Sequence, residues 1–353
     1  MRMNRTRLRI AILAAASAAM LAAALTPTTP ARGAAAAAET PRGRLVGGRA
    51  YELPEWFKTS FLTIADDARE AGALDRHAVL FMHLADCPYC ARTLDENFRA
   101  GETSEFLRRH FDVVGIDIRG SRQVEWIDGR SYTEKELARA LKVFGTPTIV
   151  FLDTRGNTVL RLNGYRRPLP FRQALEFVHG RHYQAQTLAA FVEKHKREPA
   201  YRLRPHPRFV DITNFAGHPG PLAVIFEDEG CADCDEFHDT VFTHPDVAPQ
   251  LDRFTVVRLD AQSATPIIDT DGRSTTPREW AQRLGMDYRP GIVLFDGGTE
   301  RARVDGMLYR FHFKELLRYV SGRHYVKHPL LSQYNAARRE ELLKQGVVID
   351  YSQ

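Results

Sequence analysis

Two pairs of cysteines carry the chemistry that this sequence can perform. Cys87 and Cys90 are separated by two residues in DCPYC (86–90), and Cys231 and Cys234 have the same spacing in GCADC (230–234). Thiols at this spacing serve as structural disulfides, as half of a metal site or as the reactive dithiol of an enzyme. The spacing alone does not distinguish these uses, so the surrounding sequence has to be considered.

The cysteine pairs belong to a long internal repeat. Cys231 and Cys234 follow Cys87 and Cys90 by 144 residues. In the same order, DGRS occurs at 128–131 and 271–274, FGTPTIVFLD (144–153) aligns with YRPGIVLFD (288–296), and VHGRHY (178–183) aligns with VSGRHY (320–325). Such matches at a nearly constant offset indicate two copies of one domain. The repeat is too long for a solenoid, so each copy should bury its own core.

Each copy alternates strands with helices. In the first copy we expect strands at 78–84, 113–118, 148–152 and 158–163 and helices at 55–71, 88–99, 133–143 and 170–178, the third with a capping box of Thr133 and Glu136. The second copy repeats the strands at 222–226, 255–259 and 292–295, but PRFVDITNF (207–215) replaces the first helix. Parallel strands with helical crossovers and a terminal hairpin predict the α/β class, with a central mixed sheet flanked by helices in each copy. Residues 330–343 should form an amphipathic helix that docks on either copy.

The position of the first pair favours a reactive dithiol. Cys87 follows a buried strand and opens a helix, where free backbone N–H groups and the helix dipole favour an anion. Such a site lowers the pKa of a thiol from about 8.5 toward neutrality, which yields the nucleophilic thiolate. Pro88 suits the first helical turn. Cys90, one turn further on, should be more buried and act as the resolving thiol.

The order of a strand, a Cys-x-x-Cys helix and GTPT (145–148) before another strand resembles the thioredoxin-like fold. Within that superfamily the sequence is most similar to the secreted bacterial proteins found beside sulfur-oxidation and cytochrome c maturation systems. The resemblance covers about residues 55–182 and, more weakly, 208–325. It implies that Cys87 attacks, that Cys90 resolves, and that Pro147 is a cis-proline whose loop faces the dithiol and, with Thr146, holds the substrate backbone.

Some residues depart from the family pattern. The tryptophan that commonly precedes the first cysteine is Asp86, which would disfavour the thiolate if it lay near, and the buried acid expected six residues before that cysteine is Phe81. Tyr89, an exposed aromatic in related proteins, should either contact a partner or simply fill surface. We expect His83 to pack in the strand rather than to handle protons.

The second pair lies in an acidic segment. Six of the eleven residues from 227 to 237 (EDEGCADCDEF) are acidic, which should oppose ionisation of Cys231. Arg289 stands in place of the threonine before the second loop proline, Pro290, and would either neutralise the acids or block access. The pair Cys231 and Cys234 is therefore compatible with a slower redox centre, a degenerate partner-binding domain or a permanently oxidised structural disulfide.

The N-terminus indicates export. Arginines at 2, 5, 7 and 9 precede an apolar run from 10 to 25 and a small-residue segment to about 38, as in a secretory signal, with an uncleaved anchor as the alternative. Loss of the five arginines in this segment would leave 44 basic and 44 acidic residues, which gives no electrostatic reason to expect a nucleic-acid partner. We expect a signal peptide at 1–38, thioredoxin-like domains at 50–198 and 205–328, and a helical tail at 329–353.

We expect no cofactor and no metal. A single zinc site with four cysteine ligands would require the two cysteine pairs to lie in contact. His182 and His324 lie at the ends of predicted helices, where basic residues are favourable without a metal. Neither cysteine pair is followed by the His that covalent haem attachment requires. The basic segment 194–208 should be a solvated linker.

Together these features predict a periplasmic or otherwise extracytoplasmic thiol–disulfide oxidoreductase, soluble after cleavage of the signal. It would reduce or isomerise disulfides of periplasmic proteins through Cys87 and Cys90, and a reductase would need a membrane thiol-electron transporter as donor. The oxidising direction and the oligomeric state stay open. The rival is a non-catalytic binding protein whose cysteines only stabilise the fold.

Overall fold

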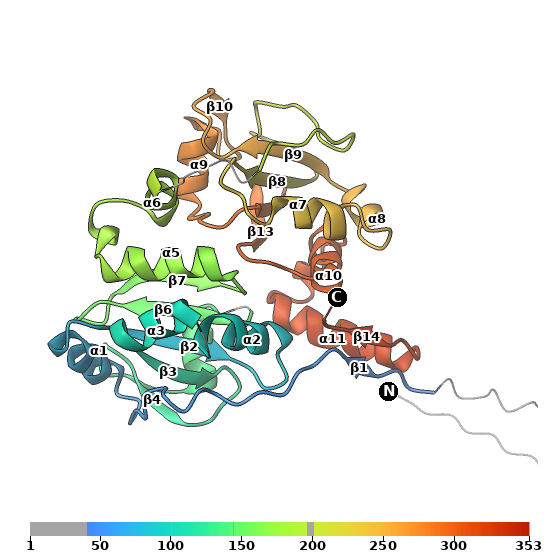
Figure 1. Ribbon diagram of the computed structural model, residues 1–353. Helices are drawn as coiled ribbons and strands as arrows, with labels where there is room; N and C mark the ends of the chain where they lie inside the picture. Colours follow the sequence, from blue (N-terminus) through green and yellow to red (C-terminus); the bar gives the residue numbers. More distant parts are fainter. Residues whose placement is uncertain (1–40, 100, 144, 196–200, 353) are drawn as a thin grey trace, which may run out of the picture. The chain divides into compact units, whose positions relative to one another are not determined.

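Two mixed sheets, one in each copy of the repeat, organise the chain. The computed structural model describes residues 41–99, 101–143, 145–195 and 201–352 (Figure 1). The segment expected to be a signal peptide lies outside these residues. The sheets have the order β3-β2-β6-β7 in the first copy and β13-β12-β8-β9 in the second, so the predicted α/β class with a mixed sheet in each copy is confirmed.

The first copy and the segment before it contain β1 (Leu45–Val46), α1 (Ile64–Ala73), β2 (His77–His83), α2 (Pro88–Thr93), the π-helix η1 (Leu94–Phe98), α3 (Gly101–His110), β3 (Phe111–Asp117), β4 (Gln123–Glu125), β5 (Ser131–Thr133), α4 (Glu134–Ala140), β6 (Thr148–Leu152), β7 (Thr158–Asn163), α5 (Pro168–His179), the 3-10 turn η2 (His182–Gln184) and α6 (Leu188–His195).

The second copy and the tail contain β8 (Pro221–Glu227), α7 (Cys234–Glu236), the π-helix η3 (Phe237–Phe242), α8 (Ala248–Leu251), β9 (Thr255–Asp260), β10 (Ile267–Ile268), β11 (Ser274–Thr275), α9 (Pro277–Arg283), β12 (Gly291–Asp296), β13 (Thr299–Val304), α10 (Arg310–Ser321), the 3-10 turn η4 (His324–Val326), α11 (Leu331–Lys344) and β14 (Ile349–Asp350).

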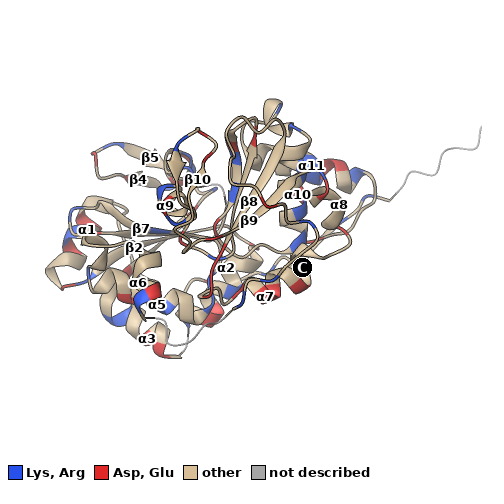
Figure 2. Cartoon of the chain, turned by 90° about the horizontal axis from the view of Figure 1, so that it is seen from above, with Lys and Arg blue, Asp and Glu red and all other residues tan. Residues whose placement is uncertain are grey.

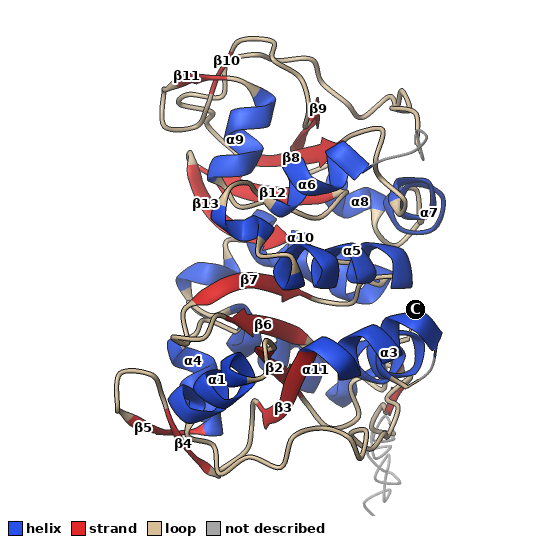
Figure 3. Cartoon of the chain, turned by 60° about the vertical axis from the view of Figure 1, so that its left-hand side comes forward, coloured by secondary structure: helices blue, strands red, loops and turns tan. Residues whose placement is uncertain are grey.

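The central strand β2 is apolar from Ala78 to Met82 because both faces of its sheet are covered. It pairs in parallel with β3 and antiparallel with β6, which in turn forms the predicted hairpin with β7. The antiparallel β6 corrects the expectation that the first three strands are parallel. Successive side chains of a strand point to opposite faces. Val79 and Phe81 therefore pack beneath α2, α3 and α5, while Ala78 and Leu80 pack against α1 and α4. Figure 3 shows α1 and α4 on one side of this sheet and α3 and α5 on the other.

The second copy keeps this layering with one helix fewer. The strand β8 pairs in parallel with β9 and antiparallel with β12. One face of the sheet packs on η3, α8 and α10, and the other on α9. The irregular segment 207–215 replaces the first helix, as predicted, and places the fully buried Phe215 where α1 lies in the first copy. Lys and Arg positions are interspersed with Asp and Glu positions along both copies (Figure 2).

Two predicted helices are wrong in part. The helix expected at 55–71 begins only at Ile64. Leu62 has φ 63°, which is not helical, and the rings of Trp56 and Phe57 each pack against Phe98. The helix expected at 88–99 changes from α to π after Thr93, and the second copy repeats this change. The hairpin β4–β5 was not predicted.

The other helices agree more closely. Thr133 and Glu136 form the predicted capping box of α4. The tail helix α11 docks on the second copy, where the Tyr334 hydroxyl donates to Glu315, and β14 then pairs in parallel with β1. Within the described residues, every helix is too short or too polar to cross a bilayer.

Candidate active site

The first cysteine pair lies at the end of β2 and at the start of α2. Cys87 is the N-cap residue of α2 and Pro88 occupies its first turn, as the sequence indicated. The two cysteines form a disulfide; Cys87 is 6% exposed and Cys90 is fully buried. The backbone N–H of Cys90 donates to Cys87 Sγ at 3.1 Å. In the reduced protein this donor would favour a thiolate at Cys87, because a hydrogen bond to the charged form stabilises it.

The loop before β6 faces the same sulfur atom. The peptide bond between Thr146 and Pro147 is cis. The Thr146 hydroxyl donates to Cys87 Sγ at 3.3 Å, and the Thr146 carbonyl oxygen lies 3.6 Å from that atom. The structure thus brings together Cys87, Cys90, Thr146 and Pro147, with two hydrogen-bond donors directed at one sulfur.

Tyr89, between the two cysteines, is not an exposed aromatic. It is 7% exposed, and its ring stacks on Tyr309 of the second copy with ring centroids 4.4 Å apart. The Tyr309 N–H donates to the Tyr89 hydroxyl at 2.7 Å, and that hydroxyl lies 3.1 Å from Nδ1 of His312. Burial lowers the pKa of His312 to about 4 and raises that of Tyr89. The first turn of α10 in the same chain therefore covers Tyr89, and the expectation of an exposed ring is wrong.

A matching contact joins the first copy to the second cysteine motif. Arg167, at the N-terminus of α5, pairs through Nε with Asp233 at 2.5 Å and through Nη2 with Glu236. In the repeat, Arg167 corresponds to Tyr309, because α5 and α10 are equivalent helices. Gly164 and Gly306 permit this close approach: a Cβ on Gly306 would lie 2.2 Å from the Asn163 carbonyl oxygen. Each copy thus uses the same segment to cover the other's cysteine motif.

The second disulfide is buried and has a different local structure. Cys231 is 2% exposed and Cys234 is fully buried. The helix α7 begins only at Cys234, so Cys231 precedes the helix and is not its N-cap. The N-terminal stabilisation available to Cys87 is therefore weaker at Cys231.

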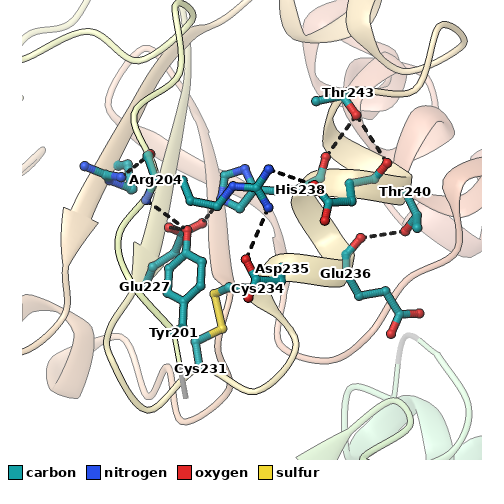
Figure 4. A network of polar contacts seen from close by, with 12 residues as sticks. Tyr201, Arg204, Glu227, Cys231, Cys234, Asp235, Glu236, His238, Thr240 and Thr243 are labelled. Carbon is teal, nitrogen blue, oxygen red and sulfur yellow. Dashed lines mark hydrogen bonds and ion pairs between the residues drawn. A yellow bond between two sulfur atoms is a disulfide. The ribbon is translucent and has the colours of Figure 1, made fainter. Parts of the chain in front are cut away.

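A polar network underlies this second disulfide (Figure 4). Tyr201 is 3% exposed and packs with the two cysteines, and its hydroxyl donates to the buried carboxylate of Glu227 at 3.0 Å. His238 Nε2 lies 2.7 Å from the same carboxylate. Because Tyr201 and Arg204 belong to 194–208, the expectation of a merely solvated linker is wrong for the described part of that segment. Arg204 pairs with Asp235 and Asp239.

The acidic segment carries less unbalanced charge than its sequence suggests. Arg289 Nε donates to Asp228 Oδ2 at 2.8 Å, so this arginine neutralises one of the acids, the first of its two predicted roles. Arg167 and Arg204 pair with Asp233, Asp235 and Glu236. The expected opposition to a Cys231 thiolate is correspondingly reduced, since paired charges largely cancel at a distance. The peptide bond before Pro290 is cis, as at Pro147.

The other residues singled out in the sequence analysis are Phe81, Asp86, His83, His182 and His324. Phe81 is fully buried. Asp86 is exposed, where solvent screens its charge. His83 stacks on Phe81, and its Nδ1 lies 2.9 Å from the Tyr51 hydroxyl; burial lowers its pKa. His182 and His324 lie in the 3-10 turns after α5 and α10, and no group of three metal-ligating side chains occurs in the ranges that the structure describes.

Sequence reasoning missed several residues around the site. Tyr309, His312 and Arg167 reach the cysteine motifs only through contacts between the copies. Tyr51 and Tyr201 were also missed, although each precedes its copy and binds the residue four positions before the first cysteine, His83 or Glu227. These tyrosines are 150 residues apart and the cysteine pairs are 144 apart, so the repeat alone does not align them.

A mixed sheet, a disulfide at the start of a cysteine helix and a cis-proline in the loop before the third strand, each present twice, define the thioredoxin class of folds. The chain belongs to the thioredoxin-like domain family, whose model matches residues 64–179 and 209–321, more than half of the sequence. No curated protein matches the chain.

Several solved structures are similar to parts of the chain. A thioredoxin-fold protein from Helicobacter pylori is 25% identical over 34% of this chain and 84% of its own, with a TM-score of 0.30. A thioredoxin from Thermus thermophilus is 27% identical over 38% of this chain and 88% of its own, with a TM-score of 0.26. A disulphide isomerase from Xylella fastidiosa is 16% identical over 42% of this chain and 98% of its own, with a TM-score of 0.25. Because these scores are low, the fold assignment rests on the family match and the sheet topology.

Proposed function

We propose that this protein is an extracytoplasmic thiol–disulfide oxidoreductase that reduces or isomerises protein disulfides through Cys87 and Cys90. The observation that carries the proposal is the set of contacts at one sulfur: the Cys90 N–H and the Thr146 hydroxyl both donate to Cys87 Sγ, at 3.1 and 3.3 Å. A structural disulfide has no need of donors directed at one of its sulfurs. An attacking or leaving thiolate does, because such donors lower its free energy.

The proposed reaction starts from the reduced pair. The Cys87 thiolate attacks one sulfur of a substrate disulfide, forms a mixed disulfide and releases the other substrate sulfur as a thiolate. Cys90 loses its proton to solvent or to that leaving thiolate and attacks Cys87 Sγ. This step forms the disulfide between residues 87 and 90 and releases the second substrate thiol. The substrate gains two electrons, which an external dithiol donor has to restore to the protein.

Access to Cys87 requires a local opening. The cysteine is 6% exposed, and the adjacent Tyr89 is held by Tyr309 and His312. In this proposal, separation of the contact between Tyr89 and α10 opens a path for a folded substrate to the sulfur. This requirement favours flexible disulfide-containing segments as substrates over disulfides inside rigid cores.

The second pair has a different role in this proposal. Cys231 lacks the N-cap position, and Tyr201 covers the disulfide. We therefore assign Cys231 and Cys234 to a slower or structural disulfide, with Pro290 in the adjacent loop. The alternative that the whole protein is a non-catalytic binder predicts that both pairs stay inert in the folded state.

Trapping of a mixed disulfide separates these functions. In a Cys231→Ser/Cys234→Ser background, Cys90→Ser leaves Cys87 without its resolving partner. Reduced Cys90→Ser protein incubated with insulin should accumulate a covalent adduct at Cys87 that dithiothreitol releases. The matched Cys87→Ser variant, which retains Cys90, should form little adduct. Absence of any adduct, together with thiols that alkylate only after denaturation, would support the binding protein instead.

A further inference from the structure

The second copy contains a cavity of about 310 Å³ beside its cysteine helix. Its walls are mostly apolar and come from η3, the strands β12 and β13 and the first turn of α10: Phe237, Val241, Ile292, Val304, Leu308 and Phe313. Glu236 and Thr240 line it from the cysteine helix and η3 (Figure 4). An apolar cavity of about 150 Å³ is already large enough to bind benzene, so this one has room for a substituted ring.

In the first copy, a tyrosine ring occupies the corresponding position. Tyr165 follows β7 and is 1% exposed. Its hydroxyl donates to Glu96, and the Arg92 guanidinium lies over its ring at 4.3 Å. At the offset of the cysteine pairs, Arg92 and Glu96 correspond to Glu236 and Thr240, two residues that line the cavity.

The residue equivalent to Tyr165 in the second copy is Met307, because α5 and α10 begin three residues after each. The two residues also form an isolated antiparallel bridge with one another. Met307 packs in part against the core of the first copy, and its sulfur lies 3.6 Å from Arg92 Nη1. The methionine sulfur is thus directed toward the neighbouring copy, while Met307 still forms part of the cavity lining. The methionine does not fill the space that a tyrosine ring fills in the first copy, and a cavity remains in the second.

We propose that this cavity is a binding site for a para-substituted phenol ring. The ring would take the place that Tyr165 takes in the first copy, between the apolar walls, with its hydroxyl at the mouth. The Thr240 hydroxyl already donates to the Glu236 carbonyl oxygen at 2.6 Å, so its oxygen can accept a hydrogen bond from the phenol, as Glu96 accepts one from Tyr165. This site does not depend on the thiol chemistry proposed for Cys87.

Titration calorimetry of the full chain with p-cresol tests the site. We expect one p-cresol per chain for the unaltered protein and none for Met307→Tyr, whose ring should fill the cavity. Met307→Leu, which keeps the cavity open, is the matched control and should bind as before. Should Met307→Tyr not fold, Val241→Phe fills the space from η3 and should also abolish binding. The reciprocal variant Tyr165→Met should create a second site and raise the stoichiometry to two.

N-Acetyltyrosinamide distinguishes the source of the ring. Binding of both ligands at the same site would indicate that a tyrosine side chain of a polypeptide can enter, whereas binding of p-cresol alone would indicate a free small phenol. The proposal is overturned if p-cresol does not bind the unaltered protein, or if Met307→Tyr and Val241→Phe bind it as well as Met307→Leu does.

Discussion

The contact between Tyr89 and the second copy should control how fast Cys87 reacts. We predict that the double variant Tyr309→Ala/His312→Ala increases the alkylation rate of reduced Cys87. The variant removes the ring stack between Tyr89 and Tyr309 and the contact of the Tyr89 hydroxyl with His312 Nδ1. It leaves the hydrogen bond from the Tyr309 backbone N–H, so the contact should loosen without being lost.

The magnitude follows from the two lost interactions. An aromatic stack contributes about 0.5–1.5 kcal/mol beyond its buried area, and a hydrogen bond contributes about 0.5–1.5 kcal/mol. Together they favour the closed contact by about 1–3 kcal/mol, which corresponds to a roughly 5- to 150-fold larger population of the open form. If opening is fast relative to alkylation, the rate rises by the same factor.

The assay is labelling of the reduced, folded protein with iodoacetamide, read by mass spectrometry of the peptide that contains Cys87. Lys314→Ala is a suitable control because Lys314 lies in the same helix but pairs with Asp246 of the second copy. An unchanged rate in the double variant, or an equal acceleration in Lys314→Ala, would refute the reasoning that this contact limits access.

Four further variants or conditions test other parts of the structure. Thr146→Val removes a hydrogen-bond donor to Cys87 Sγ and should slow alkylation of Cys87 at pH 6 about three- to tenfold, since less thiolate is present. Thr148→Val is the control, because the Thr148 hydroxyl donates to the Gly145 carbonyl oxygen and not to the cysteine. Burial lowers the pKa of His312 to about 4, so between about pH 6.5 and 4 the unfolded state binds a proton that the folded state does not bind. The free energy of unfolding, measured with urea, should therefore fall by at most about 3 kcal/mol as the pH falls from about 6.5 through 4. The fall should be smaller in His312→Gln. Burial and the nearby Asp305 raise the pKa of Asp287 to about 6, so the protonated carboxyl contributes stability below pH 3.8 that is lost as the pH rises through 6. In the same measurement, Asp287→Asn should raise the free energy of unfolding by up to about 3 kcal/mol at pH 8 and change it little at pH 4. Tyr201→Ala uncovers the second disulfide and should speed its reduction by dithiothreitol, whereas an unchanged rate would mean that Tyr201 does not protect it.

Local patterns predicted much of the fold because each reflected a short-range cause. The strands at 148–152 and 158–163 match β6 and β7 because both faces of β6 are buried and a turn separates the two. Thr133 and Glu136 predicted the start of α4 because a capping box needs only residues three positions apart. The duplication predicted the second sheet from the first.

Features that depend on distant residues were not predictable in this way. Trp56 and Phe57 lie in the segment predicted to open the first helix, yet both rings pack against Phe98, and this tertiary packing overrides the helical pattern. Tyr89 appeared free to be exposed because nothing near it in sequence covers it; Tyr309 and His312, more than 200 residues later, do so. The acidic segment looked unbalanced because its counter-charges, Arg167, Arg204 and Arg289, all lie outside it.

The central claim is that Cys87 and Cys90 form a reversible redox pair in the folded protein. The most direct test is an equilibrium titration of the Cys231→Ser/Cys234→Ser variant against reduced and oxidised glutathione, with the thiol state of residues 87 and 90 read by alkylation. We expect one reversible two-electron transition, at about −270 mV for a reductant or closer to −120 mV for an oxidant. A pair that fails to exchange with glutathione until the protein is denatured would contradict it.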